Sequence, residues 1–301
     1  MNSEVKKVFF IVNKFSGTGY PPELEASIRS AGTEYNTECD LAFTEAPGHA
    51  TRLALEAVAA GFEKVVAVGG DGTVNEVAQA LLYSHAQMGI IPKGSGNGLA
   101  RHLGIPVNPA QAVKCLFTSK VIPMDAFRMN GKLSVNVSGI GFDGHIANLF
   151  GADKKRGLQG YTKLALSEFM NFPEFDATLT LGEHELKKKA FVIAIANSSQ
   201  YGNNAMIAPS ASVCDEVLNI SILKKFPAYR LDFIYSFFSG TIDQSAYCET
   251  LRIRDGVIQL TEPMPYHIDG EYAGTADRFE IELVPASLNM LAPCDAEKLN
   301  P

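Results

Sequence analysis

The stretch VVAVGGDGTVNEVAQALL, residues 65–82, joins an apolar run to a helical pattern through three glycines that surround one acid. The run Val65–Val68 has the uniform apolarity of a strand buried on both faces, and apolar residues recur at helical spacing from Thr73 onward. Glycines at such a junction let the backbone approach a ligand, and a helix N-terminus favours an anion. The stretch predicts an anion-binding turn in which Asp71 either meets phosphate and metal charge or simply caps the helix.

The sequence around this turn alternates short apolar runs with helical segments over about the first 120 residues. Such alternation predicts a parallel sheet covered on both faces. From about residue 121, many segments alternate apolar and polar residues between Gly, Pro or Asp turns, which is typical of antiparallel strands. We therefore predict an α/β domain over residues 1–122 and an all-β sandwich domain over residues 123–289, with two helical interludes near residues 160–171 and 227–239.

Composition excludes several classes of function. A net charge of -7 disfavours a basic nucleic-acid-binding surface, so no nucleic-acid partner is expected. No apolar run reaches the roughly 20 residues that span a bilayer, and the first residues lack the long apolar run of a signal peptide. The five cysteines are scattered and form no CxxC pair, as is typical of reduced thiols. The expected location is cytoplasmic, and peripheral membrane contact through a local patch stays open.

Three polar or glycine-rich loops follow predicted strands and form the candidate phosphate-binding region. The carboxyl ends of parallel strands meet at one edge of a sheet, where ligands bind. Neither a GxxxxGK[ST] nor a true GxGxxG pattern occurs, which disfavours P-loop and dinucleotide-binding folds. Backbone N–H groups and hydroxyls would contact phosphate here. The loops are NKFSGTG (13–19), GGDGT (69–73) and KGSGNG (93–98).

These motifs carry a resemblance to a known family. GGDGTVNEV, followed about twenty residues later by PKGSGNGLAR, resembles the catalytic region of diacylglycerol kinases and sphingosine kinases. NKFSG, FTEAPGHA and HIDGEY extend the resemblance over nearly the whole chain and favour the bacterial soluble diacylglycerol kinase-like branch. The resemblance implies an N-terminal domain like those of NAD kinases and phosphofructokinases and a C-terminal β-sandwich. It also implies that the end of the chain, about residues 290–301, returns to the first domain.

The resemblance further implies roles for individual residues. Asp269 matches the proposed general base, with Glu271 beside it, and Asp71 is a competing base or metal-binding acid. Asp215 resembles an acidic ligand of a Mg²⁺ site that carbonyl groups near Ser212 and Val217 would complete. The positions that match the ATP-binding loops are Asn13, Ser16, Thr44, Gly70, Asp71, Gly72, Thr73, Glu76 and Ser95.

Two positions depart from the family pattern. Gly98 stands where bacterial diacylglycerol kinases commonly carry an aspartate near their metal network, which leaves the details of metal binding open. The sequence GSGN in the third loop also resembles sphingosine kinases more closely. Glu216 replaces a glycine that often follows the aspartate matched by Asp215.

Together these features predict a kinase of lipid metabolism and phospholipid biosynthesis. We expect it to use ATP and Mg²⁺ and to transfer the γ-phosphate to a hydroxyl of a lipid at a membrane surface, such as diacylglycerol or a sphingoid base. Two alternatives stay open, an NAD kinase-like enzyme and a catalytically silent nucleotide- or lipid-binding regulator. The sequence does not name the acceptor, and it leaves open whether the chain forms a homodimer.

Overall fold

The structure, a computed structural model, describes residues 6–17, 19, 21–152, 158–227 and 229–293. The chain divides into two compact units. Unit 1 comprises Met1–Met124 and Ala286–Asn300, and unit 2 comprises Asp125–Pro285. The chain passes between the units within strands β5 (Lys120–Met129) and β16 (Glu271–Ala292). Of the predicted returning segment, residues 294–301 lie outside the described residues.

Unit 1 is built on parallel strands, as the sequence predicts. The central strand β1 pairs with β2 on one side and β3 on the other, and β3 pairs with β4. The end of β16 pairs parallel to β4 at Asn289 and Met290. Strands β1, β3 and β4 are apolar and largely buried because helices cover both faces, whereas the edge strand β2 has no buried residue. Their bounds are β1 (Lys6–Val12), β2 (Thr37–Phe43), β3 (Lys64–Gly69) and β4 (Gln87–Pro92).

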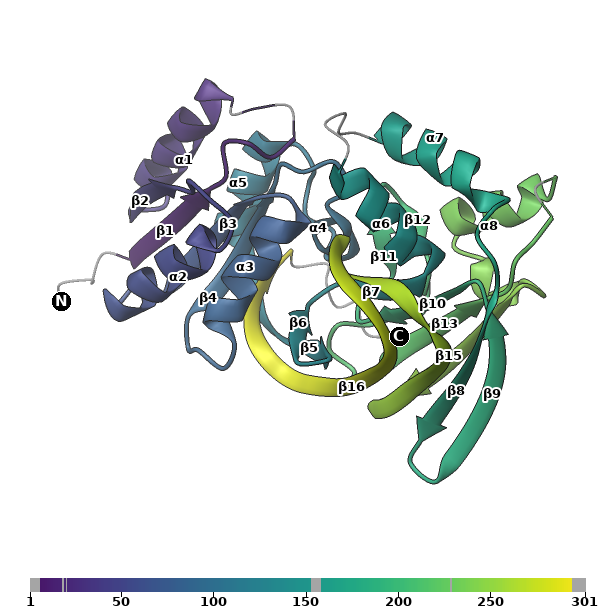
Figure 1. Cartoon of the computed structure of the whole chain (residues 1–301). Coiled ribbons are helices and arrows are strands. Elements are labelled where there is room, and N and C mark those ends of the chain that lie inside the picture. Colours follow the sequence, from purple (N-terminus) through teal and green to yellow (C-terminus); the bar gives the residue numbers. More distant parts are fainter. Residues whose placement is uncertain (1–5, 18, 20, 153–157, 228, 294–301) are drawn as a thin grey trace. The chain divides into compact units, whose positions relative to one another are not determined.

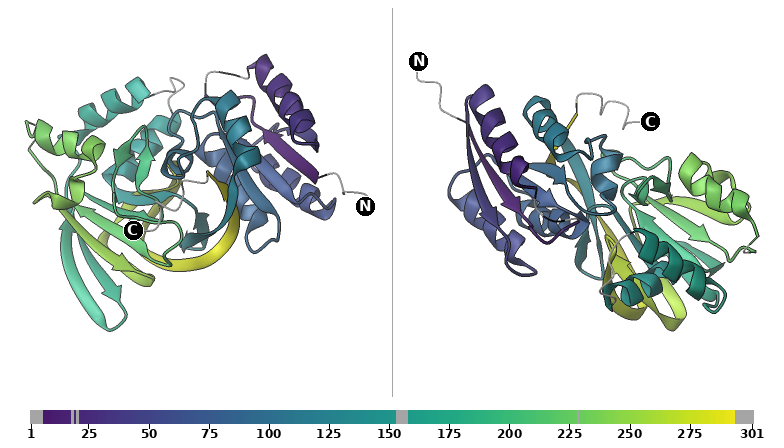
Figure 2. Two further views of the ribbon diagram at one scale, coloured as in Figure 1. Left: turned by 180° about the vertical axis from the view of Figure 1, so that it is seen from behind. Right: turned by 90° about the horizontal axis from the view of Figure 1, so that it is seen from above.

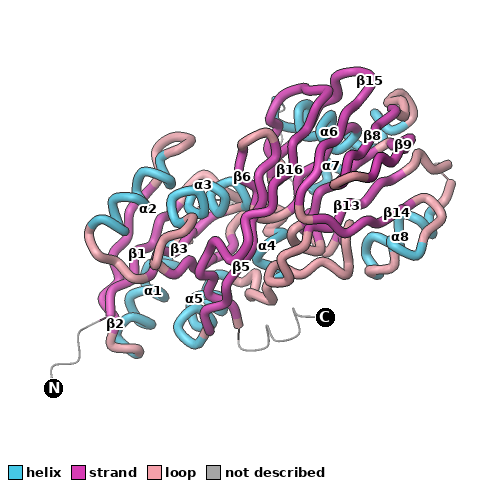
Figure 3. Tube along the Cα trace, turned by 90° about the horizontal axis from the view of Figure 1, so that it is seen from below, coloured by secondary structure: helices cyan, strands magenta, loops and turns pink. Residues whose placement is uncertain are grey.

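Two pairs of helices cover the sheet of unit 1. Helix α1 (Pro22–Glu34) packs beside α5 (Pro109–Thr118) on one face, and α2 (His49–Ala59) packs beside α3 (Asp71–Leu81) on the other (Figure 3). The short helix α4 (Gly98–His102) follows the third loop. The sequence analysis did not predict α5, although it has clear start signals. Pro109 is its first residue, and the Asn108 side chain accepts a hydrogen bond from the backbone N–H of Gln111.

Unit 2 is built on antiparallel strands, which confirms the predicted change of architecture. In order across the sheet, β14, β13, β10, β7, β15 and β16 are neighbours, and each pair within unit 2 is antiparallel. Strands β8 and β9 form a hairpin beside β15, drawn as a pair of long teal arrows in Figure 2. The remaining bounds are β6 (Lys132–Ser134), β7 (Val137–Gly141), β8 (Phe175–Leu181), β9 (His184–Ala190), β10 (Val192–Ala196), β11 (Gln200–Gly202), β12 (Ala205–Met206), β13 (Leu218–Leu223), β14 (Cys248–Ile253) and β15 (Asp255–Ile268).

Three helices accompany these strands (Figure 1). Helices α7 (Leu158–Phe169) and α8 (Leu231–Ser239) fall in the two predicted interludes, and a short 3₁₀ turn spans Ile242–Gln244. Helix α6 (Phe142–Ala152) corrects the reading of GIGFDG as the end of a strand, because the chain turns directly from β7 into a helix. Phe142 stacks on Phe191 with ring centroids 4.6 Å apart, which anchors the start of α6 in the core of unit 2.

Candidate functional site

The three predicted phosphate loops lie against one another at the carboxyl ends of β1, β3 and β4 in unit 1. A Cβ atom added at Gly94 would lie 2.5 Å from the Cα of Gly70, and one at Gly17 would lie 2.0 Å from the carbonyl oxygen of Lys93. Backbone therefore packs directly on backbone, which only glycine permits. The glycines of the opening stretch are thus explained by loop packing, and the packing also leaves backbone N–H groups near a prospective phosphate.

Asp71 joins the second loop to the third. Its Oδ2 accepts a hydrogen bond of 3.0 Å from the Asn97 backbone N–H, and its Oδ1 accepts one of 2.9 Å from that of Gly98. The N-cap of α3 is Gly70, which makes no side-chain cap. The prediction that Asp71 is the N-cap residue is therefore wrong. Asp71 is the first residue of α3 and reaches across to the start of α4, where the exposed N–H groups favour a negative charge.

Asn97 gives the third loop its shape. Its backbone is left-handed at φ 53°, a region that asparagine tolerates better than most residues. The side-chain Oδ1 accepts from the Gly94 N–H at 2.8 Å, and Nδ2 donates to the Gly94 carbonyl at 2.8 Å. Gly98 follows directly and offers its N–H to Asp71. At the position where an aspartate is common in the bacterial diacylglycerol kinases, this chain therefore contributes a backbone donor.

Lys93 and Asn13 fix the first loop. The Lys93 Nζ donates to the carbonyl oxygens of Ser16 at 2.5 Å and Gly19 at 2.8 Å. Burial lowers the pKa of Lys93, because an ammonium group loses hydration there. Asn13 Nδ2 donates to Thr73 Oγ1 at 3.1 Å, which connects the first loop to the second. Lys93 was considered as a phosphate ligand, and its described bonds instead organise the loop.

The other predicted nucleotide-loop residues differ in their surroundings. Thr44 is buried after β2, Ser16 donates to the Asn13 carbonyl at 3.0 Å, and Ser95 is exposed. The two carboxylate oxygens of Glu76 accept from the N–H groups of Gly48 and Ala50 at 2.8 and 3.0 Å. Glu76 thereby caps the start of α2. The role of each in nucleotide binding stays a prediction.

Asp269 lies in unit 2 within a buried set of donors. It is 6% exposed, and its carboxylate accepts from Ser134 Oγ at 2.5 Å and from the N–H groups of Val135 and Asn136 at 3.0 Å each. Its backbone is left-handed at φ 47°, and it is followed by Gly270 at φ 89°. These donors stabilise an ionised carboxylate and fix its orientation.

Glu271 does not share this environment. It is exposed at the first position of β16, and its backbone pairs with Ile268 across the hairpin turn. The structure therefore separates the two acids of HIDGEY, with Asp269 turned inward and Glu271 at the surface. A supporting role for Glu271 stays a prediction.

The predicted Mg²⁺ segment is a compact turn before β13. Asp215 Oδ2 forms an ion pair of 2.6 Å with Arg252, and its Oδ1 accepts from the Val217 N–H at 3.3 Å. Ser212 is fully buried, and its Oγ accepts from the Cys214 N–H. Glu216 adopts φ 55°, which explains why glycine is common there in the family.

Two observations bear on whether this segment suits a cation. Among the described residues, no group of three or more His, Cys, Asp or Glu side chains is arranged to hold a metal. Both amide atoms of Asn219 are buried without a partner within that same part of the chain. Asn219 lies on the face of β13 where Ser221 Oγ donates to the Ile207 carbonyl. Buried amide atoms of this kind suit a bound water. The role of Asp215, Ser212 and Val217 in holding Mg²⁺ stays a prediction.

Sequence reasoning missed Asp125, Asp143 and His267. Asp125 is 1% exposed, and its Oδ2 accepts from the Glu216 N–H at 2.8 Å, so it shapes the Asp215 turn. Asp143 and His267 are buried together, and His267 lies two residues before Asp269 in the chain. The adjacency of His267 to Asp269 in HIDGEY was the one signal available for this pair.

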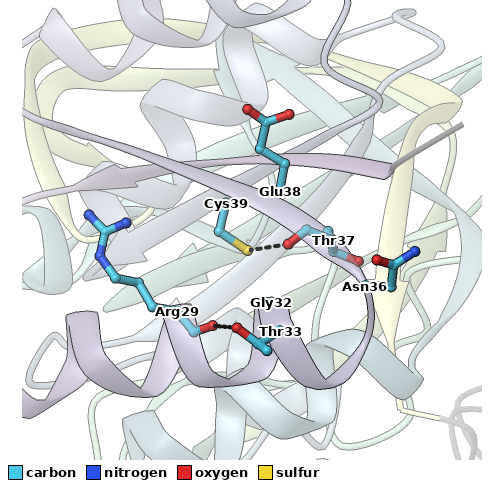
Figure 4. A pocket seen from close by; sticks show the side chains of 7 residues that line it. All are labelled: Arg29, Gly32, Thr33, Asn36, Thr37, Glu38 and Cys39. Carbon is cyan, nitrogen blue, oxygen red and sulfur yellow. Dashed lines mark hydrogen bonds between the residues drawn. The ribbon is translucent and has the colours of Figure 1, made fainter.

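A surface pocket of unit 1 lies apart from all of these residues. It lies between α1 and β2 (Figure 4), and none of the predicted site residues lines it. Cys39 lines the pocket, and its Sγ lies 3.8 Å from the Thr37 carbonyl oxygen. The lining residues are Arg29, Gly32, Thr33, Asn36, Thr37, Glu38 and Cys39.

Comparison with known proteins agrees with this geometry. Residues 7–129 match the diacylglycerol kinase catalytic domain, and residues 136–292 match the YegS C-terminal NAD kinase beta sandwich-like domain. The chain therefore belongs to the YegS-like family of lipid kinases, which confirms the predicted kinase and both predicted fold types.

Named relatives extend the match over most of the chain. A probable lipid kinase YegS-like protein of Klebsiella pneumoniae is 32% identical, covering 84% of this chain and 85% of the relative. One of Pseudomonas aeruginosa is 29% identical, covering 92% of each chain. The crystal structure of a putative diacylglycerol kinase from Bacillus anthracis shares the fold, with a TM-score of 0.80, 24% identity, and coverage of 98% of this chain and 99% of the other.

Proposed function

We propose that this kinase binds ATP on the three loops of unit 1 and transfers its γ-phosphate to a lipid hydroxyl whose proton Asp269 accepts. The observation that carries the proposal is the inward, hydrogen-bonded Asp269 carboxylate in a left-handed turn. Asp-Gly is a favoured pair in turns with positive φ, so the support comes from the buried carboxylate and its three donors and not from backbone strain.

The loops of unit 1 supply positioning rather than covalent chemistry. Phosphoryl transfer passes through a loose transition state, so catalysis depends on holding the phosphates and balancing their charge. The glycine contacts bring the backbones of the loops close together, and Thr73 is held in place by Asn13. Asp71 keeps the second and third loops together. We expect loss of this junction to weaken ATP binding.

Asp269 suits the role of proton acceptor for a hydroxyl. Three donors orient the carboxylate, and a carboxylate has capacity for about four hydrogen bonds, so a further bond to a hydroxyl is available. In a loose transition state the hydroxyl proton becomes acidic only as the new P–O bond forms, so a weak base suffices. Mg²⁺ bound with ATP supplies charge neutralisation. Asp215 and the carbonyl oxygens of Ser212 and Val217 are the proposed residues for a protein-bound Mg²⁺.

A surface on α8 supports a membrane as the place where the lipid is met. Leu231, Tyr235 and Phe238 are spaced as one stripe and are 70%, 69% and 54% exposed, and Tyr229 before the helix is 80% exposed. The other face of α8 buries Phe233 in the core, so the helix is apolar on both sides. Tyrosine and apolar side chains together suit the boundary between headgroups and acyl chains. No helix among the described residues is long and apolar enough to cross a membrane.

The membrane proposal is tested by flotation with vesicles of phosphatidylglycerol that contain diacylglycerol. Tyr235→Ser with Phe238→Ser should reduce binding several-fold and leave turnover of a short-chain, micelle-free lipid unchanged. Leu55→Ser, which changes a 53% exposed residue on α2, is the matched control. Equal vesicle binding by all three proteins would remove α8 from the membrane contact.

The acceptor is tested with a panel. ATP labelled in the γ-phosphate is supplied with diacylglycerol, a sphingoid base, phosphatidylglycerol or NAD, with Mg²⁺ present or removed by a chelator. Asp269→Asn prepared in parallel reports contaminating kinases. Label in one lipid, lost in the variant and without Mg²⁺, supports the proposal. Label in NAD alone favours the NAD kinase-like alternative, and ATP binding without any transfer favours a silent regulator.

A further inference from the structure

Two buried side chains, Asp143 and His267, and the half-buried Tyr201 form a relay in unit 2 that ends at the turn carrying Asp269. Asp143 Oδ2 accepts from the Tyr201 hydroxyl at 2.9 Å and lies 3.2 Å from His267 Nε2. His267 Nδ1 in turn accepts from the Gly270 N–H at 3.1 Å. His267 is 3% exposed and Asp143 is 8% exposed. Tyr201, Asp143 and His267 are here called the Tyr–Asp–His relay.

The hydrogen bonds fix the tautomer of His267. A backbone N–H can only donate, so Nδ1 must carry a lone pair, and the ring proton of neutral His267 lies on Nε2. Nε2 then donates to Asp143, whose other oxygen accepts from the Gly144 N–H at 2.8 Å. Each atom of the relay therefore has one role, and the direction of donation runs from Gly270 to His267 and from His267 to Asp143.

The relay acts on the peptide that follows Asp269. The N–H group that donates to His267 belongs to the peptide bond between Asp269 and Gly270. These are the two central residues of the turn between β15 and β16. Both have positive φ, as in the tight turns that favour Asp-Gly. A register shift between Tyr266 and His267 accompanies the turn. The Asp269 side chain is held separately by Ser134, Val135 and Asn136. Backbone and side chain of Asp269 are thus fixed from two directions.

The sequence makes room for the relay at a specific glycine. A Cβ atom at Gly139, which pairs with His267 between β7 and β15, would lie 1.8 Å from Asp143 Oδ2 and 2.9 Å from His267 Nε2. Only glycine leaves space for the Asp143–His267 bond. The GIGFDG segment therefore supplies both the acid of the relay, Asp143, and the clearance that the relay needs.

Turn stability alone does not account for these residues. Asp-Gly already favours a turn with two positive φ angles, and buried polar groups cost free energy unless every bond is made. We propose that the Tyr–Asp–His relay is a positioning device that holds Asp269 in its catalytic orientation. The proposal rests on the proposed function, in which Asp269 accepts the hydroxyl proton. The relay touches neither substrate nor nucleotide in this role.

Two substitutions at His267 separate its two bonds. In His267→Asn the amide oxygen takes the place of Nδ1 and keeps the acceptor for Gly270. In His267→Gln the amide nitrogen takes the place of Nε2 and keeps only the donor to Asp143. Positioning predicts that kcat falls by about 10²-fold in the Gln variant, as for a small misplacement of a reacting group, and less than tenfold in the Asn variant. The KM for ATP should be unchanged in both.

The matched control is His145→Gln, the same substitution at a histidine whose Nε2 contacts Glu168 at 3.0 Å and which shares no hydrogen bond with the relay. It should keep wild-type kcat. Tyr201→Phe removes only the hydroxyl group that donates a hydrogen bond to Asp143. It should lower kcat by a smaller factor than His267→Gln. Equal kcat in the Asn and Gln variants, with both folded, would overturn the positioning role.

Hydrogen exchange of the Gly270 amide gives a readout independent of activity. The amide should be protected in the wild type and in His267→Asn and exchange much faster in His267→Gln. Equal protection in all three would overturn the relay. Faster exchange in the Gln variant with unchanged kcat would overturn its effect on catalysis. If the wild type phosphorylates no lipid while the exchange pattern holds, the proposed function fails and the relay geometry stands.

Discussion

Asp71 in unit 1 and Asp269 in unit 2 are both held by backbone N–H groups, yet their surroundings differ. Asp71 joins two loops about a helix start, and its partners, Asn97 and Gly98, are themselves part of the candidate phosphate region. Asp269 occupies a left-handed turn, and three donors from residues 134–136 hold its side chain. The first arrangement is typical of loop closure, and the second holds one buried carboxylate in a fixed orientation, as a reacting group requires. On this basis we propose nucleotide positioning for unit 1 and proton transfer for unit 2.

A large effect on ATP binding is expected from crowding the loops of unit 1. Gly94→Ala places a Cβ atom 2.5 Å from the Gly70 Cα and 3.0 Å from Asn97 Oδ1. Overpacking of this kind costs about 1–3 kcal/mol, and where that cost falls on the ATP-bound loops the ATP affinity should fall by about 5- to 100-fold. Isothermal titration with ATP measures the change. Gly104→Ala, at a glycine with φ 71° and open space around it, should lower stability without the loss of affinity.

Gly94→Ala also tests the comparison. If its ATP affinity equals that of the wild type, the loops do not form the nucleotide site. The assignment of unit 1 would then lose its main support, whatever the role of Asp269.

A smaller effect is expected at Glu76, which the family resemblance places in the phosphate loop and the structure places at the start of α2. Glu76→Ala should lower the free energy of unfolding by about 0.5–2 kcal/mol, the usual cost of a lost helix cap. ATP affinity should change little. Thermal unfolding and ATP titration of the same sample decide between the roles. Unchanged stability with a large loss of ATP affinity would restore Glu76 to the nucleotide site.

The smallest effect is expected at Glu216, beside the proposed Mg²⁺ residues. Its φ of 55° costs a non-glycine residue about 1–2 kcal/mol. Its ion pair with Arg254 is exposed on both sides and contributes little. Glu216→Gly should therefore raise the unfolding free energy by about 1 kcal/mol, measured by urea denaturation. A destabilised variant would show that the Arg254 contact matters more than backbone strain.

The sequence predicted the strands of unit 1 and the grouping of its three loops because both depend on local patterns. Apolar runs and glycine-rich turns are visible along the chain, and parallel strands bring their carboxyl ends together. Which atoms meet at that edge was not predictable. Asp71 bonds residues 26 and 27 positions away, and the same spacing would also allow a metal or a helix cap.

The start of α6 and the Tyr–Asp–His relay were missed for one physical reason. GIGFDG was interpreted as the end of a strand, but tertiary packing requires glycine at Gly139, Gly141 and Gly144. A Cβ atom at Gly144 would lie 2.4 Å from the Pro265 carbonyl oxygen, and one at Gly139 would clash with Asp143. Asp143 and His267 are 124 residues apart, so no local pattern joins them. Family resemblance identified Asp269 but not the residues that hold it.

The division of labour between the two aspartates is tested most directly by measuring kcat and the ATP dissociation constant for Asp71→Asn and Asp269→Asn with the same lipid. Asp269→Asn should lower kcat by about 10²–10⁴-fold, the usual contribution of a general base, and leave ATP binding unchanged. Asp71→Asn should weaken ATP binding by about 10- to 100-fold, because hydrogen bonds to a charged group contribute about 1.5–3 kcal/mol. Circular dichroism of both variants confirms folding. If Asp269→Asn keeps most of its turnover, the assignment fails, and Asp71 becomes the better candidate for the base.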